Sequence, residues 1–434
     1  MKPITAVLLG AGSRGRYIYG PYAEKYPNDL RIVAVAEPDE MRRRQFAEKH
    51  GIGEDNAFAS WERVFEQGRI ADAMIVSTLD RMHYAPTMKA LALGYHVLLE
   101  KPMSPDPTEC VRLSQASSAG GRLLVVSHVL RYSPFWAGIK RTIEAGEIGK
   151  IAGIQLTENV GYRHMTHSYV RGNWRKSAET SPMILAKSCH DLDILSWLMD
   201  EPCISVSSFG SLLHFRAEHA PEGATDRCID GCAVERDCPF SALRLYRQPP
   251  DHPWARYITG DLSPEGIDKA LREGSFGRCV YRCDNDVVDH QVVSLSFASG
   301  ASATFTMSGF TEGGSRRVQI MGTRGEITGD MEEGTFTLYR FSTGERVEVR
   351  CGVAGDGHGG GDEVMVGAFV KHVREFERSA AAGLTSASAS LQSHLMAFAA
   401  ERSRLNGGQA VRIPEMIEAL EAGGQPDADG ELPK

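Results

Sequence analysis

The sequence has no apolar run that approaches the roughly 20 residues needed to span a bilayer, so we expect no membrane partner. It has no excess of positive charge either, since 48 basic residues stand against 56 acidic ones and give a formal charge of −8. A protein with that balance lacks the basic surface that holds nucleic acid. No segment repeats along the 434 residues, which excludes a repeat array. These absences leave a globular protein of about two or three domains.

A pattern typical of secretion is also missing. The apolar run at residues 4–9 stops at glycines after about six residues, which is too short for the apolar core of a signal peptide. We therefore interpret this run as a strand and expect a cytoplasmic protein. In a reducing compartment the nine cysteines are free thiols, buried side chains or metal ligands.

Residues 1–128 alternate short apolar runs with helical patterns. This alternation of strand and helix predicts an α/β fold that begins with a doubly wound parallel sheet of the Rossmann type. Each apolar run is short enough to be a buried strand of such a sheet. The predicted strands cover residues 4–9, 31–36, 73–77, 96–99 and 122–126.

Residues 129–434 follow a different pattern and predict a second domain. A helix and a strand come first, and residues 290–310 and 317–330 then alternate apolar and polar positions with turns between them. Alternation with a period of two predicts a largely antiparallel sheet. Residues 215–285 are rich in cysteine, proline and charge and interrupt this pattern. We interpret them as an insertion.

A glycine motif follows the first predicted strand and opens a helix. The sequence GAGSRG at residues 10–15 has the G-x-G-x-x-G spacing, which allows a tight turn and lets backbone amides approach a pyrophosphate. The second predicted strand leads to Glu37, about 22 residues after the motif, where a carboxylate can bind both hydroxyls of a ribose. The candidate cofactor residues in this region are Gly10, Gly12, Ser13, Arg14, Gly15 and Glu37.

The acidic residue favours NAD as the cofactor, because a carboxylate repels the 2′-phosphate of NADP. Arg42, Arg43 and Arg44 lie close enough in the sequence to keep NADP open. Further candidates follow the later strands, since ligands bind at the carboxyl ends of the strands in such sheets. These candidates are Ser77, Thr78, Leu79, Asp80, His83, Glu100 and Lys101.

Five segments in this order resemble the glucose–fructose oxidoreductase/inositol dehydrogenase/MocA family. The resemblance implies a Rossmann domain and then an α/β domain with a large open sheet, which favours a homodimer or homotetramer. It also implies that Lys101 is catalytic, that the Lys101–Pro102 bond is cis, and that Arg131 lies near the nicotinamide. The five segments are GAGSRG, the acid at Glu37, STLDRMH at 77–83, EKP at 100–102 and RYSPFWAGIKRTIEAGEIGKI at 131–151.

Family dehydrogenases typically carry Asp-x-x-x-His on a helix of the second domain. The matching stretch, residues 181–195, has His190 but has Ala186 four positions earlier. The missing aspartate puts the usual proton relay in doubt. The candidate catalytic residues are then Lys101, as the acid/base, and His190, as a base or as a hydrogen-bonding partner of a substrate hydroxyl.

Cations and aromatic residues are concentrated in residues 159–177. Aromatic faces suit a sugar ring, and arginine side chains suit a carboxylate, sulfonate or phosphate. We therefore hypothesise an anionic carbohydrate as the substrate, with a solvated basic loop or a subunit contact as the alternatives. The candidate substrate residues are Tyr162, Arg163, His164, His167, Arg171, Trp174 and, from the later stretch, Lys187.

A second glycine loop, GHGGGDE at residues 357–363, comes just before a helix. Consecutive glycines allow the backbone to approach a ligand closely or form a simple turn. The loop carries His358 and Asp362, and its position favours a lip of the active site.

Five of the nine cysteines fall within the insertion, but none of them has the familiar C-x2-C spacing of zinc sites. We predict a structural zinc ion held by four thiolates, because such a site would stabilise a loop-rich segment. An iron–sulfur site, disulfides and unlinked buried thiols are the alternatives. The predicted zinc ligands are Cys228, Cys232, Cys238 and Cys283.

The leading function is an NAD-dependent oxidoreductase that acts on a sugar, cyclitol or acidic sugar by hydride transfer at a ring hydroxyl. An alternative comes from relatives that are NAD-dependent glycoside hydrolases, which oxidise the ring transiently, eliminate the aglycone, add water and recycle the cofactor. That alternative includes sulfonated or carboxylated glycosides. A third class is a non-catalytic NAD-binding protein. The missing aspartate favours this third class, whereas retention of Lys101 and His190 argues against it.

Overall fold

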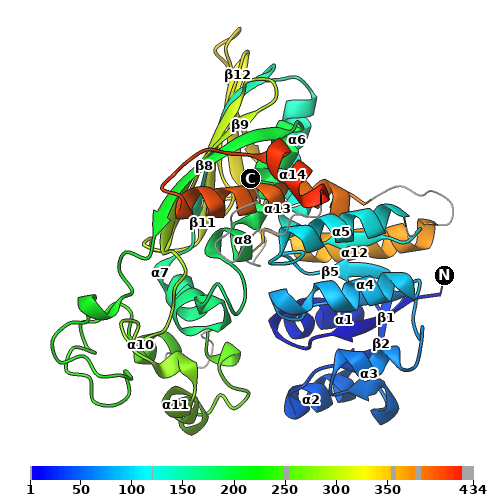
Figure 1. Cartoon of the computed structure of the whole chain (residues 1–434), viewed down its shortest axis with the longest axis vertical. Helices are drawn as coiled ribbons and strands as arrows, with labels where there is room; N and C mark the ends of the chain where they lie inside the picture. The colour runs from blue at the N-terminus through cyan, green and yellow to red at the C-terminus, as the bar shows by residue number, and fades with distance from the viewer. Residues whose placement is uncertain (1, 120, 248–253, 353–357, 377–382, 423–434) are drawn as a thin grey trace.

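The computed structural model describes residues 2–119, 121–247, 254–352, 358–376 and 383–422 (Figure 1). Two sheets organise these residues. The first sheet has six parallel strands in the order β3-β2-β1-β4-β5-β6, and the second has nine strands. The predicted α/β fold, with a Rossmann-type sheet followed by a mostly antiparallel sheet, is confirmed.

The first sheet confirms the five predicted strands and adds β3, which is too short to stand out in the sequence. The central strands β4 and β5 are buried along their whole length, because helices cover both faces of the sheet. The strands are β1 (Ile4–Leu9), β2 (Leu30–Ala36), β3 (Ala57–Phe58), β4 (Ala73–Val76), β5 (His96–Leu99) and β6 (Leu124–Val126). The helices between them are α1 (Gly20–Lys25), α2 (Glu40–His50), α3 (Trp61–Phe65), α4 (Tyr84–Ala92) and α5 (Pro107–Ala119).

Helix α12 (Gly361–Glu375) comes from the far end of the chain but packs on the first sheet. Its residues Met365 and Phe369 are buried in the same apolar cluster as Leu8 and Ile75 of the strands. The C-terminal part of the chain therefore helps to build the core next to the glycine motif. This return of the chain brings the loop before α12 to the edge of the sheet where ligands bind.

The second sheet is mixed, in the order β14-β13-β12-β11-β7-β10-β9-β8-β15. Only β7 and β10 pair in parallel among these neighbours. The predicted hairpin is the antiparallel pair of β9 and β10. The strands are β7 (Ile151–Asn159), β8 (Cys203–Ser211), β9 (His290–Phe297), β10 (Ser302–Ser308), β11 (Ser315–Gly322), β12 (Gly325–Asp330), β13 (Thr335–Arg340), β14 (Arg346–Arg350) and β15 (Val411–Arg412).

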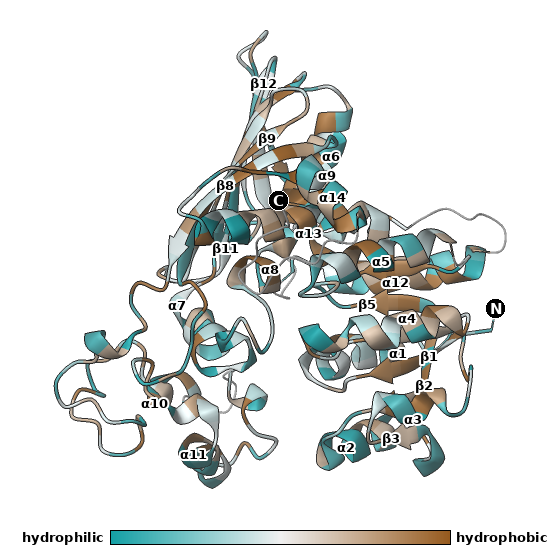
Figure 2. Ribbon diagram, viewed as in Figure 1, coloured by the Kyte–Doolittle hydropathy of each residue, from teal (hydrophilic) through white to brown (hydrophobic). Residues whose placement is uncertain are grey.

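Helices cover one face of this sheet, and Figure 2 shows apolar residues on α13 beside it, whereas α2 and α11 at the surface are largely hydrophilic. Along β9, Val293 and Leu295 are buried, while Val292 and Ser294 on the opposite face are exposed. Oligomerisation through that exposed face stays a prediction. The covering helices are α6 (Pro134–Glu144), α9 (Cys189–Met199), α13 (Ala387–Leu405) and α14 (Ile413–Glu421).

The insertion lies between β8 and β9. Its described residues contain α10 (Ala242–Tyr246) and α11 (Pro264–Glu273), which share a small apolar cluster that includes Leu245 and Leu271. Figure 1 shows both helices beyond the second sheet, facing α1 and α2 of the first. No helix in the described part of the chain is long and apolar enough to cross a bilayer.

Candidate functional site

The glycine motif forms a tight loop between β1 and the helical turn Gly15–Tyr19. A Cβ atom on Gly10, which has a φ of +92°, would lie 2.5 Å from the carbonyl oxygen of Ser77, and one on Gly15 would lie 2.5 Å from that of Gly10. At Gly12, by contrast, a Cβ atom would meet nothing within 4 Å. The outer two glycines are therefore required by packing, and the middle one leaves open space above the loop. This is the form of a cradle for a pyrophosphate.

Glu37 comes directly after β2 and is buried beside this loop. Its carboxylate accepts hydrogen bonds of 2.9 Å from the amide of Ala11 and 3.1 Å from the amide of Asp39. These bonds hold the carboxylate at the position where a ribose would meet the sheet. An acceptor group there fits the two hydroxyls of an unphosphorylated ribose.

The three arginines that made NADP a possible cofactor have partners within the protein. Arg42 lies 3.7 Å from the Glu37 carboxylate, and Arg43 donates to the Glu37 carbonyl oxygen at 2.6 Å. Arg44 lies 3.6 Å from Glu40 on the same helix. Their charges are therefore directed at protein acceptors.

Glu100 connects the end of β5 to the glycine motif. One of its carboxylate oxygens accepts hydrogen bonds from Arg14, Tyr19 and Ser127. Burial alone would raise the pKa of Glu100, but Arg14, the hydrogen bond from Tyr19 and the charge of Lys101 together lower the pKa below its ordinary value. The acid beside Lys101 is thus a structural anchor that fixes the strand end against the cofactor loop.

Lys101 follows this anchor, and the Lys101–Pro102 bond is cis, as the resemblance implied. The Lys101 ammonium donates a hydrogen bond of 2.7 Å to the carbonyl oxygen of Ala186. Ala186 ends the short helix α8 (Met183–Ala186), one helical turn before His190. A main-chain oxygen therefore holds the lysine at the position where family dehydrogenases carry an aspartate.

His190 lies on α9 and is almost completely buried. Burial, with the nearby charge of Lys101, holds the pKa of His190 well below its ordinary value, so the ring is neutral. Its Nδ1 atom is buried and has no hydrogen-bond partner among the described residues. Lys101 and His190 thus form one cluster with two different proton-binding groups.

The second glycine loop reaches the same cluster. The ring of His358 lies 5.6 Å from the ring of His190, measured between centroids. Asp362 lies 2.8 Å from Nδ1 of His358, and its other oxygen lies 2.7 Å from Arg14. Burial would raise the pKa of Asp362, but the charges of Arg14 and His358 hold it well below its ordinary value. Arg14 therefore links Glu100 to the loop that carries His358.

An ionic network that the sequence did not reveal lies beside His190. Glu158 on β7 lies 2.9 Å from both Lys187 and Arg316, and Arg316 lies 2.7 Å from Asp191. Burial, although opposed by Arg316, raises the pKa of Asp191 to about 6. Glu158 and Arg316 are directly opposite each other on β7 and β11. Opposite charges at matching positions of two strands can identify such an ion pair, but only when the pairing of the strands is already known.

Asp80 and its neighbours form a contact between the two parts of the molecule. The Asp80 carboxylate accepts hydrogen bonds of 3.1 Å from the indole of Trp174 and 2.6 Å from the hydroxyl of Ser181. The predicted cofactor residue Asp80 and the predicted substrate residue Trp174 are thus partners of each other. Thr78 donates to a carbonyl oxygen at the end of the same turn, and Leu79 is 44% exposed.

His83 and Arg131 also have partners within the protein. The ring nitrogens of His83 lie 2.6 Å and 3.1 Å from the carbonyl oxygens of Pro102 and Thr78. Arg131 donates two hydrogen bonds of 2.7 Å to the carboxylate of Asp193. These side chains shape the strand ends and the contact with α9.

Apart from Trp174, which is bound to Asp80, the predicted substrate residues separate into three pairs. His164 and Lys187 belong to the Lys101 cluster, since burial lowers the pKa of His164 and both Lys187 and Lys101 contribute to lowering it. Tyr162 and Arg163 line a different cavity, of about 200 Å³, together with Arg244 of the insertion. The remaining two residues, His167 and Arg171, are buried against the insertion.

His167 and Arg171, which the sequence predicted to bind substrate, have partners in the insertion. His167 lies 2.7 Å from the hydroxyl of Tyr246. Arg171 is fully buried and donates hydrogen bonds of 2.7 Å to the carbonyl oxygens of Arg278 and Phe240. Both side chains hold the insertion in place.

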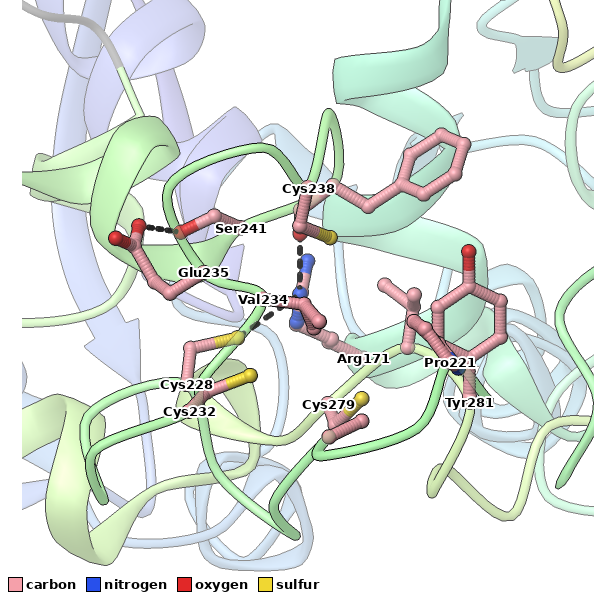
Figure 3. A pocket seen from close by; sticks show the side chains of 13 residues that line it. Arg171, Pro221, Cys228, Cys232, Val234, Glu235, Cys238, Ser241, Cys279 and Tyr281 are labelled. Carbon is pink, nitrogen blue, oxygen red and sulfur yellow. Dashed lines mark hydrogen bonds between the residues drawn. The ribbon is translucent and has the colours of Figure 1, made fainter. Parts of the chain in front are cut away.

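The predicted zinc site is not supported. Cys228, Cys232, Cys238 and Cys279 line one cavity of about 10 Å³, whereas Cys283 does not line it. Figure 3 shows the guanidinium of Arg171 between their sulfur atoms, so a side-chain cation takes the central space. Among the described residues, no three His, Cys, Asp or Glu side chains are arranged to hold a metal ion.

Comparison with known proteins agrees with this architecture. Residues 4–128 match the model of an oxidoreductase family with an NAD-binding Rossmann fold, and residues 140–390 match the C-terminal alpha/beta domain of the same family. The chain belongs to this oxidoreductase family. The resemblance inferred from the sequence is confirmed, and the protein is an NAD-dependent oxidoreductase.

Several relatives have named activities. The chain is 25% identical to YteT of Bacillus subtilis (strain 168), over 83% of this chain and 87% of YteT. It is 30% identical to inositol 2-dehydrogenase 4 of Saccharopolyspora erythraea, over 50% of this chain and 60% of that enzyme. Among solved structures, levoglucosan dehydrogenase in complex with NADH and levoglucosan superposes with a TM-score of 0.69 at 17% identity, over 95% of this chain and all of the other. That structural likeness supports the fold.

Proposed function

We propose that this oxidoreductase oxidises a ring hydroxyl of a sugar or cyclitol, with Lys101 as the acid/base. The observation that carries the proposal is the position of Lys101. Its ammonium is held by the Ala186 oxygen at 2.7 Å, and the preceding residue, Glu100, is bound to Arg14 of the glycine motif. The lysine is therefore fixed between the cofactor loop and the helix that carries His190.

The residues around the glycine motif fit NAD better than NADP. The open space above Gly12 suits a pyrophosphate, and the Glu37 carboxylate suits the ribose hydroxyls. Arg42, Arg43 and Arg44 each have an acceptor within the protein, which favours NAD over NADP. NAD, when bound, supplies the acceptor for the hydride that leaves the carbinol carbon.

The protein side chains handle the proton of that reaction. In its neutral amine form, Lys101 takes the hydroxyl proton while the C–H bond breaks, so that the alcohol becomes a ketone and the amine becomes an ammonium. His190 is neutral and can hold the reacting or the adjacent hydroxyl by a hydrogen bond. The Ala186 oxygen orients the lysine without adding a negative charge that would hold the proton on it.

The substrate class is supported by the names of relatives and by the charges in the site. The inositol and levoglucosan dehydrogenases named above act on, or bind, polyhydroxylated rings. Lys187 is already paired with Glu158, and Arg171 is buried in the insertion. These pairings favour a neutral ring over an anionic substrate.

The test uses purified protein, NAD and a panel of inositols, hexoses, anhydrosugars and their acidic derivatives, with absorbance at 340 nm as the readout. We expect stoichiometric NADH with a neutral ring, and a much lower kcat/KM for acidic derivatives. Absence of NADH with every compound, in protein that binds NAD, would contradict a dehydrogenase.

The position of His358 favours a second candidate, an NAD-dependent glycoside hydrolase. A redox-neutral elimination needs one residue to remove a proton from carbon and another to protonate the leaving oxygen. His358, oriented by Asp362 beside His190, gives the cluster such an additional group. Release of an aryl aglycone that requires NAD but accumulates no NADH would support this candidate over the first.

A further inference from the structure

The insertion approaches the cofactor edge of the first sheet through its residues 254–262, which we name the strap. The edge of the Tyr257 ring contacts Tyr17, with 5.7 Å between the ring centroids. The guanidinium of Arg256 lies 4.8 Å from the centre of the same Tyr17 ring. Tyr17 comes two residues after Gly15, so the strap contacts the helical turn that follows the glycine motif.

The end of the strap passes close to helix α2. A Cβ atom built on Gly260 would be 3.5 Å from the methyl carbon of Met41, so the two residues are near neighbours. Met41 lies in the first turn of α2, four residues after Glu37. The strap therefore contacts the turn after the glycine motif and lies close to the start of α2, and these two segments enclose the adenosine half of a dinucleotide in this fold.

The base of the strap is anchored in the interior of the second part of the molecule. Trp254 and Tyr257 pack around the ring of His167, with centroid distances of 4.8 Å and 5.8 Å. His167 lies 2.7 Å from the Tyr246 hydroxyl on α10. This aromatic cluster gives the strap a fixed position, which explains why His167 is buried here instead of facing Lys101.

The charge of the strap suits an anionic ligand. Two guanidinium groups lie near Tyr17, since Arg16 is 5.2 Å and Arg256 is 4.8 Å from the centre of its ring. Two cations therefore lie close to the helical turn that follows the glycine motif. Their attraction adds to the amide groups of the loop.

We propose that the strap forms the outer wall of the cofactor site and closes over the adenosine half of NAD. The proposal rests on the use of NAD proposed above and adds Arg256 and Tyr257 as cofactor-retaining residues from the insertion. Release of the cofactor then requires separation of the strap from Tyr17 and Met41. Slow release would then limit the exchange of NADH for NAD that each turnover requires.

The test measures the dissociation rate of NADH from the full chain by displacement with excess NAD in a stopped-flow fluorimeter. We expect the double variant Arg256→Ala/Tyr257→Ala to release NADH about tenfold faster, because it loses one cation–π contact and one aromatic pair. The variant Tyr17→Leu, which removes the same contacts from the opposite side, should give a similar increase. Arg272→Ala, an exposed change on α11, serves as the matched control.

The outcomes separate this inference from the proposed function. An unchanged NADH dissociation rate in both strap-contact variants, with thermal melting like that of the wild type, would overturn the strap while NAD use stands. Failure of the wild-type chain to bind NADH would overturn the proposed function and the strap together. Faster release in both variants, with the control unchanged, would support the strap.

Discussion

The Lys101 ammonium donates a hydrogen bond of 2.7 Å to the main-chain oxygen of Ala186. A carbonyl oxygen orients an amine as a carboxylate does, but it carries no full charge and cannot take up the proton. The missing aspartate therefore changes the proton chemistry of the site more than its geometry. In the proposed mechanism, proton removal depends on Lys101 and on the neutral histidines around it.

Replacement of Lys101 tests this assignment. We expect Lys101→Met to lower kcat by about 10²- to 10⁴-fold, the usual contribution of a general acid/base, with little change in NADH affinity. Steady-state kinetics and a fluorescence titration with NADH measure the two quantities. Lys371→Met, an exposed change on α12, is the control. Retention of full kcat in Lys101→Met would exclude the lysine as the base.

Replacement of Glu37 tests the choice of cofactor. We expect Glu37→Gln to weaken NADH binding by roughly tenfold, because charge-assisted hydrogen bonds to the ribose are lost. Binding of NADPH should weaken less or improve, since the repulsion of its phosphate is also lost. Titration of both cofactors gives the ratio, and the exposed Glu40→Gln serves as the control. An unchanged ratio of affinities would mean that Glu37 does not face the ribose.

The site residues that the sequence predicted are those whose positions depend on residues close to them in the sequence. The GAGSRG loop, Glu37 and the Glu100–Lys101 pair each lie at the end of a short apolar strand, and the strand order of this fold brings such ends together. Local pattern and a common topology were sufficient for these strand-end residues. His190, by contrast, was identified from the family's Asp-x-x-x-His motif.

The remaining features depend on contacts between distant parts of the chain. His358 lies beside His190 because α12 returns to the first sheet, and no local pattern in the sequence encodes that return. Arg171 and His167 are close in sequence to the site, but the insertion folds around them and buries them. Cys279 lines the cysteine cavity, although the spacing of the cysteines gave no reason to prefer it to Cys283.

Replacement of Arg171 tests its structural role. Arg171→Met would leave the carbonyl oxygens of Phe240 and Arg278 without these donors, and we expect a loss of stability of about 2–4 kcal/mol. Urea denaturation followed by tryptophan fluorescence measures this loss. Arg244→Met, at an exposed position of the insertion, should change stability by less than about 0.5 kcal/mol. Equal stability of the two variants would contradict the role of Arg171 as an internal support.

The pair of His358 and Asp362 makes a prediction about pH. Because the folded-state pKa of Asp362 lies below its ordinary value of 3.8, the carboxylate stabilises the fold above that pH, and the stabilisation is lost as the pH falls through the lower folded-state pKa. Asp362→Asn should therefore cost about 2 kcal/mol at pH 7 and less at pH 3, measured by urea denaturation. Asp268→Asn, which breaks the more exposed pair with Arg247, should cost at most about 1 kcal/mol. A cost of Asp362→Asn that grows towards acid pH would show that the carboxylate does not hold Arg14 and His358 in the folded protein.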